Sequence, residues 1–311
     1  MILSQGNGEE HKMSYANEIE KRYEQKIYSL TPDFSKTVLR LEVTNICNHA
    51  CIFCPHSKQK RQQGYMNHET MQRLIMEAGE LGIPKLALFL NGEPFLNERL
   101  AEYVKLAKEV GISFVFTTTN GTGVPVTKYY EAMEAGLDSL KFSINAGSRE
   151  TYRLIHGRDT FDEAVGNFRK VREYRDSHNL KCRLLSGFIV TRHTVHEVEK
   201  HEKLISEIAD DNVFSEPDNF GGYMNVEVKD LKVEIPDTVP KYVFNSKKLP
   251  CTMLFNSINV TWEGYLTLCC SEALNMLVVD DINNKTIRQV WYSDKMKQLR
   301  EENIEGVVSM E

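Results

Sequence analysis

The segment VLRLEVTNICNHACIFC (residues 38–54) decides the fold, because it joins an apolar strand pattern directly to three closely spaced cysteines. Its first part, VLRLEV, is rich in aliphatic and β-branched residues and predicts a buried strand. Cys47, Cys51 and Cys54 follow in one eight-residue loop. A cysteine loop directly after a buried strand indicates a metal or redox site at one edge of a sheet.

Further strand patterns follow this segment, and their spacing is typical of βα units. They cover residues 85–90, 112–118, 139–144, 183–190 and 212–216. Between the strands, apolar residues recur at helical spacing: Met71, Leu74, Ile75 and Ala78, then Leu100, Tyr103, Val104 and Ala107. Thr160 and Glu163 predict a capping box at the start of another helix. We therefore predict an α/β fold with a partial (β/α)6 TIM-like barrel of parallel strands.

Polar segments directly follow the predicted strands. In a parallel barrel, the active-site residues lie on these loops after the C-terminal ends of the strands. Asn91-Gly92-Glu93-Pro94 follows the second strand, Thr119-Asn120-Gly121-Thr122 the third, and Asn145-Ala146-Gly147 the fourth. The cysteine loop follows the first. We expect these four loops to meet at one mouth of the barrel.

The composition limits the kinds of partner that the chain is expected to bind. The chain has 311 residues, with 38 Lys and Arg against 44 Asp and Glu, a formal charge of -6 and a pI near 5.9, which argues against nucleic-acid binding. Its apolar runs are only strand-sized, so neither a membrane span nor a signal peptide is expected. Seven cysteines, an odd number, argue against a disulfide framework. We expect a cytoplasmic protein that acts on a small molecule or a peptide.

The chain divides into four predicted parts. Residues 1–36 are polar and form an N-terminal arm, and residues 37–220 form the barrel. Residues 221–248 are irregular and interrupted by prolines, which indicates a linker. Residues 249–311 form a small α+β unit with a hairpin at Trp262-Glu263-Gly264 and an amphipathic closing helix.

The cysteine loop, C-N-H-A-C-I-F-C, resembles that of radical S-adenosylmethionine (SAM) enzymes. A cubane cluster needs one thiolate per iron, so three cysteines leave the fourth iron open. The resemblance implies a [4Fe-4S] cluster on Cys47, Cys51 and Cys54, with SAM bound at the open iron. A reductant such as flavodoxin or ferredoxin would then drive cleavage of SAM to a 5'-deoxyadenosyl radical. The alternative from the residues alone is a zinc site that adds His49 or His56 to the three cysteines.

The resemblance also implies SAM-binding residues. Asn91-Gly92-Glu93-Pro94 is similar to the family's Gly-Gly-Glu-Pro segment, in which the backbone and the carboxylate receive the SAM ammonium. Asn91 departs from that pattern. The remaining implied SAM contacts are Asn120, Ser143, Asn145 and Arg192, after strands three, four and five. Read without the family, the same segments are ordinary polar turns or solvated loops.

His156 and Arg158 follow the fourth strand and are candidates for moving a proton or binding a polar substrate group. A structural role at a helix end is the alternative for both residues.

Cys251, a hairpin with Gly264, and the pair Cys269-Cys270 resemble the start of a SPASM/twitch auxiliary domain, which binds a second iron-sulfur cluster. Members close that cluster with a later cysteine pair, and this sequence stops about where the pair would begin. Adjacent cysteines on a strand would point to opposite faces, so both should rarely serve one cluster. The remaining explanations are a shortened chain, a cluster with an open iron or a non-cysteine ligand, and a domain without a cluster.

The resemblance implies an oxidoreductase that abstracts a substrate hydrogen. If the auxiliary site is occupied, it would take the electron left on the substrate, and dehydrogenation of a small sugar or cyclitol-like molecule fits. A maturase that modifies a peptide side chain and a redox-neutral sugar epimerase use the same parts. The non-enzyme alternative is a metal-binding scaffold.

Overall fold

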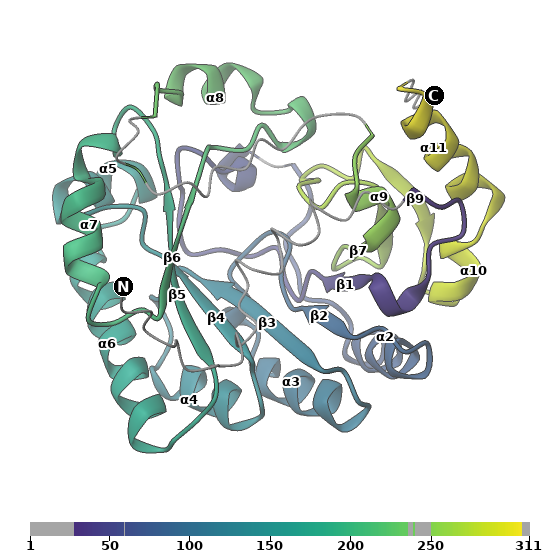
Figure 1. Ribbon diagram of the computed structural model, residues 1–311, viewed down its shortest axis with the longest axis horizontal. Coiled ribbons are helices and arrows are strands. Elements are labelled where there is room, and N and C mark those ends of the chain that lie inside the picture. Colours follow the sequence, from purple (N-terminus) through teal and green to yellow (C-terminus); the bar gives the residue numbers. More distant parts are fainter. Residues whose placement is uncertain (1–27, 59, 236–238, 240–249, 307–311) are drawn as a thin grey trace, which may run out of the picture.

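The computed structural model describes residues 28–58, 60–235, 239 and 250–306. In these residues the strands form one curved sheet in the order β6-β5-β4-β3-β2-β1-β7-β8-β9 (Figure 1). The strands are β1 (Val38–Leu41), β2 (Lys85–Ala87), β3 (Phe114–Thr119), β4 (Ser139–Ser143), β5 (Arg183–Ile189), β6 (Asp211–Ser215), β7 (Ser257–Val260), β8 (Tyr265–Thr267) and β9 (Val278–Asp281).

The first six strands pair in parallel with their sequence neighbours. The outer strands of the sheet, β6 and β9, do not pair with each other, so the barrel is open. The predicted partial barrel is therefore confirmed, and each of its six strands lies within two to three residues of the predicted segment.

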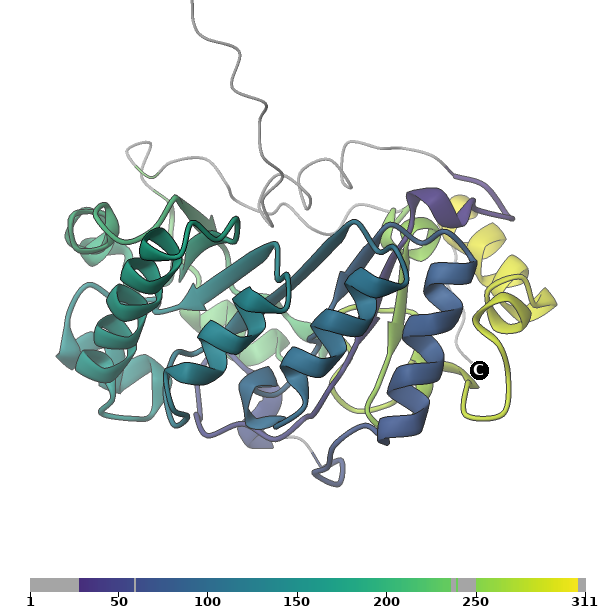
Figure 2. The same cartoon turned by 90° about the horizontal axis from the view of Figure 1, so that it is seen from below.

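Helices cover the convex face of the sheet (Figures 1 and 2). They are α2 (His68–Glu80), α3 (Leu100–Glu109), α4 (Thr127–Glu134), α5 (Arg149–His156), α6 (Phe161–Ser177) and α7 (Val198–Ile205). The apolar spacing that predicted α2 and α3 is confirmed, because all eight residues of the two patterns are buried. Asn67 caps α2 by accepting a hydrogen bond from the Thr70 N–H.

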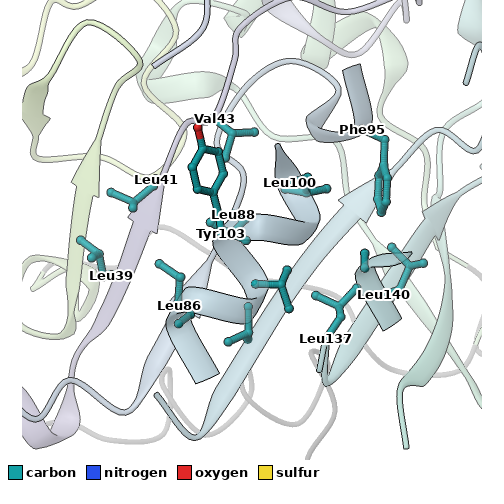
Figure 3. Close-up of a cluster of buried hydrophobic side chains, with 14 of the residues drawn as sticks. Leu39, Leu41, Val43, Leu86, Leu88, Phe95, Leu100, Tyr103, Leu137 and Leu140 are labelled. Carbon is teal, nitrogen blue, oxygen red and sulfur yellow. The ribbon is translucent and has the colours of Figure 1, made fainter. Parts of the chain in front are cut away.

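The two faces of the sheet carry different cores. Leu39 and Leu41 of β1 pack with Leu86 of β2 and Tyr103 of α3 on the helix side (Figure 3). The alternate residues form a separate apolar cluster that contains no helix residue: Val38, Ala87, Phe89, Phe114, Phe116, Leu185 and Val213. Since side chains alternate along a strand, this second cluster lies on the concave face.

The predicted capping box at Thr160 does not form. Helix α6 begins at Phe161, and the Thr160 side chain makes no capping hydrogen bond. Its Oγ1 lies 3.4 Å from Nε2 of His49, and Glu163 Oε1 accepts a hydrogen bond of 2.8 Å from the Gly123 N–H. Both side chains face the loops at the barrel mouth, and these longer-range partners replace the local cap.

The C-terminal part continues the barrel sheet. Strand β7 pairs in parallel with β1, and the antiparallel strands β8 and β9 follow it. The predicted hairpin at Trp262-Glu263-Gly264 is confirmed: Gly264 has a φ of 88°, and a Cβ there would lie 2.3 Å from Asn283 Oδ1. This unit also contains α9 (Met253–Asn256), α10 (Ile287–Trp291) and α11 (Asp294–Glu305).

The predicted linker contains a short helix, α8 (Asn225–Leu231). Residues 1–27 of the predicted arm and residues 236–238 and 240–248 of the predicted linker lie outside the described residues. Across the described part of the chain, no helix combines the length and the apolar character that crossing a membrane requires.

Candidate active site

The cysteine loop lies between β1 and a short 3-10 helix, η2 (Pro55–Lys58), and its three cysteines are half-buried. Backbone hydrogen bonds fix it to the end of α5: the Ala50 N–H donates to the His156 carbonyl at 3.1 Å and the Ile52 N–H to the Ile155 carbonyl at 2.9 Å. Gly157 closes α5 with a φ of 65°, and its lack of a Cβ allows this close approach. These contacts hold the cysteine loop against the C-terminal end of α5.

The three thiols are suited to act as ligands of an iron-sulfur cluster. Burial raises the pKa of Cys47 to about 12, with a further contribution from the Glu93 charge, and burial also raises the pKa of Cys51 and Cys54. Ionised Cys54 opposes ionisation of both Cys47 and Cys51. Positive iron relieves this cost when the thiolates form. Asn120 Nδ2, 3.9 Å from Cys47 Sγ, can donate a hydrogen bond to that sulfur.

His156 lies behind the cysteine loop and is 1 % exposed. Its Nε2 is 2.8 Å from the Ile144 carbonyl and so carries the proton, which leaves the Nδ1 lone pair 3.2 Å from Cys51 Sγ. Burial lowers the pKa of His156 to about 3. The side chain therefore faces Cys51 as a neutral group, and its predicted part in proton movement stays a prediction.

The zinc alternative takes a different form in the structure. Ligand atoms of His49, Cys51 and His156 all lie within 4.8 Å of one another, whereas His56 is not part of this group. Such a site would use Cys51 alone and would leave Cys47 and Cys54 without a role. The cysteine triad accounts for all three thiols.

The Asn91-Gly92-Glu93-Pro94 turn packs on the backbone that leads into the cysteine loop. Gly92 has a φ of 77°, and a Cβ there would lie 2.4 Å from the Thr44 carbonyl oxygen, so only glycine fits. The Glu93 N–H donates to the Ile46 carbonyl at 2.8 Å. Among the described residues, no hydrogen-bond donor reaches the carbonyl oxygens of Asn91 and Gly92, and these oxygens suit an ammonium group.

The Glu93 carboxylate is 2 % exposed and is already bonded by the protein. It accepts hydrogen bonds from the Thr119 hydroxyl at 2.8 Å, the Asn120 N–H at 2.7 Å and the Phe95 N–H at 3.2 Å. Burial raises the pKa of Glu93 to about 7. The carboxylate thus joins the second and third strand loops, and its predicted contact with the SAM ammonium stays a prediction.

The raised pKa of Glu93 predicts a pH effect on the iron-free chain. Unfolded Glu93 ionises near 4.5 and folded Glu93 near 7, so the folded state holds the extra proton between these values. The Glu93 contribution to the free energy of unfolding should therefore be fully present below pH 4.5 and fall by about 3 kcal/mol as the pH rises to 7. Urea unfolding of wild type and Glu93→Gln at several pH values measures this difference, and a difference independent of pH would contradict it.

The structure gathers some of the other predicted residues at the cysteine loop. Asn120 Nδ2 donates to Asn48 Oδ1 at 2.6 Å, and Arg158 Nε donates to the Asn48 carbonyl at 2.9 Å. Asn48, in turn, donates to the Thr122 carbonyl at 3.1 Å. The sequence analysis did not single out Asn48, although its position between two cysteines was a signal that could have identified it.

The remaining predicted contacts lie farther along the sheet. The Ser143 hydroxyl is 3.2 Å from the Thr118 hydroxyl on β3. Asn145, with a φ of 53°, uses its Oδ1 to accept from the Ile189 N–H at 2.8 Å, so it connects β4 to β5. Arg192 is half-exposed and donates to Asp230 on α8 at 3.4 Å. Asp230 is thus an ionic partner of Arg192, and the predicted contact of Arg192 with SAM stays a prediction.

The C-terminal cysteines differ from the expectation in one respect. Strand β8 ends at Thr267, so Cys269 and Cys270 lie in the following loop and the alternation of a strand does not separate them. A hydrogen bond that the Cys269 thiol donates to the neighbouring Cys270 sulfur, together with burial, raises the pKa of Cys269 well above its usual value. The two thiols can therefore face one site. Cys251 is held by α11, where Asn303 Oδ1 accepts from the Cys251 N–H at 3.1 Å.

Curated relatives match part of the chain. The probable GTP 3',8-cyclase of Pyrococcus horikoshii is 31% identical over 134 residues, which cover 43% of this chain and 42% of that protein. The GTP 3',8-cyclase of Chlorobaculum tepidum is 34% identical over 138 residues, covering 43% of this chain and 41% of that protein. The matched regions thus span less than half the length of these relatives.

Solved structures with the same fold extend over most of the chain. BtrN in complex with AdoMet and 2-DOIA covers 87% of this chain and 87% of its own, with 20% identity and a TM-score of 0.56. Streptococcus suis SuiB bound to the precursor peptide SuiA covers 91% of this chain and 69% of its own, with 13% identity and a TM-score of 0.65.

Family models agree with the geometry of both cysteine regions. Residues 251–308 match an iron-sulfur cluster-binding domain, SPASM. Residues 41–205, which include the cysteine triad and the Asn91–Pro94 turn, match the radical SAM superfamily. The chain therefore belongs to the radical SAM superfamily, whose enzymes use a [4Fe-4S] cluster and SAM.

Proposed function

We propose that this chain removes a hydrogen atom from a small, oxygen-rich substrate of the sugar or cyclitol type and oxidises it. The observation that carries the choice of substrate is Arg40, a buried cation on the concave face of the barrel. In this proposal the cysteine triad and the Asn91–Pro94 turn serve to generate the radical, and Arg40 binds the substrate.

Arg40 belongs to the face that the helices do not cover. It pairs in register with Ala87, which belongs to the concave apolar cluster, and its guanidinium lies 5.4 Å from the centre of the Phe89 ring. Its exposed fraction is 5%, and its buried Nε has no hydrogen-bond partner among the described residues. An unsatisfied buried N–H is costly. A hydroxyl, carboxylate or phosphate oxygen of a substrate would satisfy it.

Polar groups on the same face of the sheet as Arg40 support the same class of substrate. Lys141, Thr118 and Ser143 occupy alternate positions on β3 and β4 that face the barrel interior. Gly187, which pairs with Ser143, leaves room for Lys141, because a Cβ at Gly187 would lie 3.3 Å from the lysine side chain. A cation, two hydroxyls and an aromatic ring on one concave face suit a polyol better than an apolar ligand.

The proposed roles divide between the two cysteine regions. Cys47, Cys51 and Cys54 would hold the cluster, and the carbonyl groups of Asn91 and Gly92 would orient the SAM ammonium beside it. When bound, the cluster and SAM together supply an electron and a radical able to abstract hydrogen. Oxidation of the substrate needs an acceptor for one further electron. We assign that part to a second cluster held by Cys251, Cys269 and Cys270.

The proposed function is tested by following deuterium. Anaerobically reconstituted chain, dithionite and SAM should form 5'-deoxyadenosine, and perdeuterated substrate should transfer deuterium to it. The panel consists of hexoses, aminohexoses and cyclitols, free and phosphorylated, with GTP and a mixed peptide library as the alternatives. Deuterium from a sugar or cyclitol supports the proposal. Transfer only from GTP or peptides contradicts the substrate class, and no 5'-deoxyadenosine from chain with a formed cluster contradicts the whole proposal.

A further inference from the structure

We propose that Asn91 is a positioning residue that couples the SAM-binding turn to the C-terminal cysteine loop, residues 269–277. SAM binding at the turn would then tighten the segment that carries Cys269 and Cys270. The inference rests on the proposed function, because it takes the Asn91–Pro94 turn as part of the SAM site.

The Asn91 amide bridges two parts of the chain that are far apart in sequence. Its Nδ2 donates at 2.8 Å to Oε1 of Glu42, at the end of β1, and at 2.8 Å to the backbone carbonyl of Glu272. A primary amide carries two N–H groups, so both hydrogen bonds can form together. Glycine, which the family pattern places here, has no side chain to make either bond.

Glu272 organises the C-terminal cysteine loop. Its N–H donates to the Cys269 carbonyl at 3.2 Å, and its carboxylate accepts from the backbone N–H groups of Leu274 at 2.5 Å and Leu277 at 2.8 Å. A hydrogen bond to the Glu272 carbonyl therefore acts on the centre of the loop. A shift of Asn91 by a few tenths of an ångström would change its strength, since hydrogen bonds depend steeply on geometry.

The other side of Asn91 is fixed to the first cysteine loop. Gly92 touches the backbone at Thr44, and the Glu93 N–H is bonded to the Ile46 carbonyl, one residue before Cys47. One turn thus contacts the backbone just before Cys47 on one side and the Glu272 carbonyl, three residues after Cys269, on the other. If a ligand orders this turn, these contacts transmit the ordering to both loops.

A second anchor of the C-terminal loop provides a matched control. Asn275 Nδ2 donates at 3.0 Å to Oε1 of Glu263, at the tip of the β7–β8 hairpin. This bond also restrains the loop, but it does not touch the SAM-binding turn. Asn275 has a φ of 60°, so Asn275→Gly removes the amide and keeps the backbone conformation accessible.

Hydrogen–deuterium exchange of anaerobically reconstituted full-length chain, with and without SAM, tests the coupling. In wild type, SAM should slow exchange in residues 90–97 and, by about threefold or more, in residues 269–277. In Asn91→Ala, SAM should still protect residues 90–97, while protection of residues 269–277 is lost. In Asn275→Gly, residues 269–277 should exchange faster without SAM and still respond to it.

The outcomes separate the inference from the proposed function. Equal SAM protection of residues 269–277 in wild type and Asn91→Ala would overturn the coupling, as would protection of residues 90–97 alone in wild type. Loss of the SAM response in Asn275→Gly would overturn the specific role of Asn91. No SAM-dependent change anywhere, in chain with a formed cluster, would overturn the proposed function and the coupling with it.

Discussion

Replacing Cys47, Cys51 and Cys54 together with alanine is expected to lower 5'-deoxyadenosine formation by at least about a thousandfold. The three thiols lie on one loop and influence one another's ionisation, and their loss leaves no ligand for the cluster that reduces SAM. Product is measured by chromatography after anaerobic reconstitution with iron and sulfide. Iron and sulfide content of the same samples reports whether a cluster formed.

Two control variants show where the effect arises. Cys182→Ala changes a cysteine that is buried in the helix-side core at 2% exposure, so SAM cleavage should stay within about twofold of wild type. Cys269→Ala with Cys270→Ala should lower the iron content and leave SAM cleavage in place. A triple variant that still cleaves SAM would contradict the cysteine assignment. Metal lost on His49→Ala but kept on Cys47→Ala would favour the mixed His/Cys site.

The parts of the fold that follow from local patterns were predictable. Met71, Leu74, Ile75 and Ala78 repeat at helical spacing, and their burial in α2 follows from that spacing alone. The hairpin at Gly264 was equally local, because its turn needs a residue with positive φ. Thr160 shows the limit of such reasoning: its local capping signal was outweighed by contacts with the cysteine loop.

The parts that depend on distant pairings were not predictable from one sequence. No local pattern indicates that β7 adds to the barrel sheet beside β1. The position of His156 against Cys51 depends on how α5 docks on the cysteine loop, although both residues were already candidates. Asn91 was noted only as a departure from the family pattern. Its role emerges from Glu42 and Glu272, which lie on separate elements and carry no motif.

Arg61→Ala is expected to lower the free energy of unfolding by about 3–5 kcal/mol. The Arg61 side chain is 3% exposed and lies between the carboxylates of Glu42, at 0%, and Glu263, at 18%. Its Nη2 is 2.5 Å from an oxygen of each carboxylate, and its Nε donates to Glu263 at 3.0 Å. Without the guanidinium, two negative charges remain in a site that water barely reaches, and the cost of burying them is no longer offset.

An exposed ion pair on the same segment provides the comparison. Lys58 pairs with Glu227 at side-chain exposures of 45% and 33%, so Lys58→Ala should cost no more than about 1 kcal/mol. Both variants are measured by urea unfolding of the iron-free chain at one pH. A cost below 1 kcal/mol for Arg61→Ala would contradict the assignment of a buried, paired network.

The loss of stability caused by Arg61→Ala should affect the whole barrel and should not be confined to one loop. Glu42 directly follows β1 and also accepts hydrogen bonds from the Asn91 amide and from the Trp262 N–H at the tip of the β7–β8 hairpin. Its carboxylate thus joins β1 to the Asn91–Pro94 turn and to the C-terminal part. Adding Glu263→Gln to Arg61→Ala removes one of the two stranded charges and should recover about 1–2 kcal/mol. Such recovery from a second substitution would show that uncompensated charge causes the loss, since a lost packing contact would not be restored.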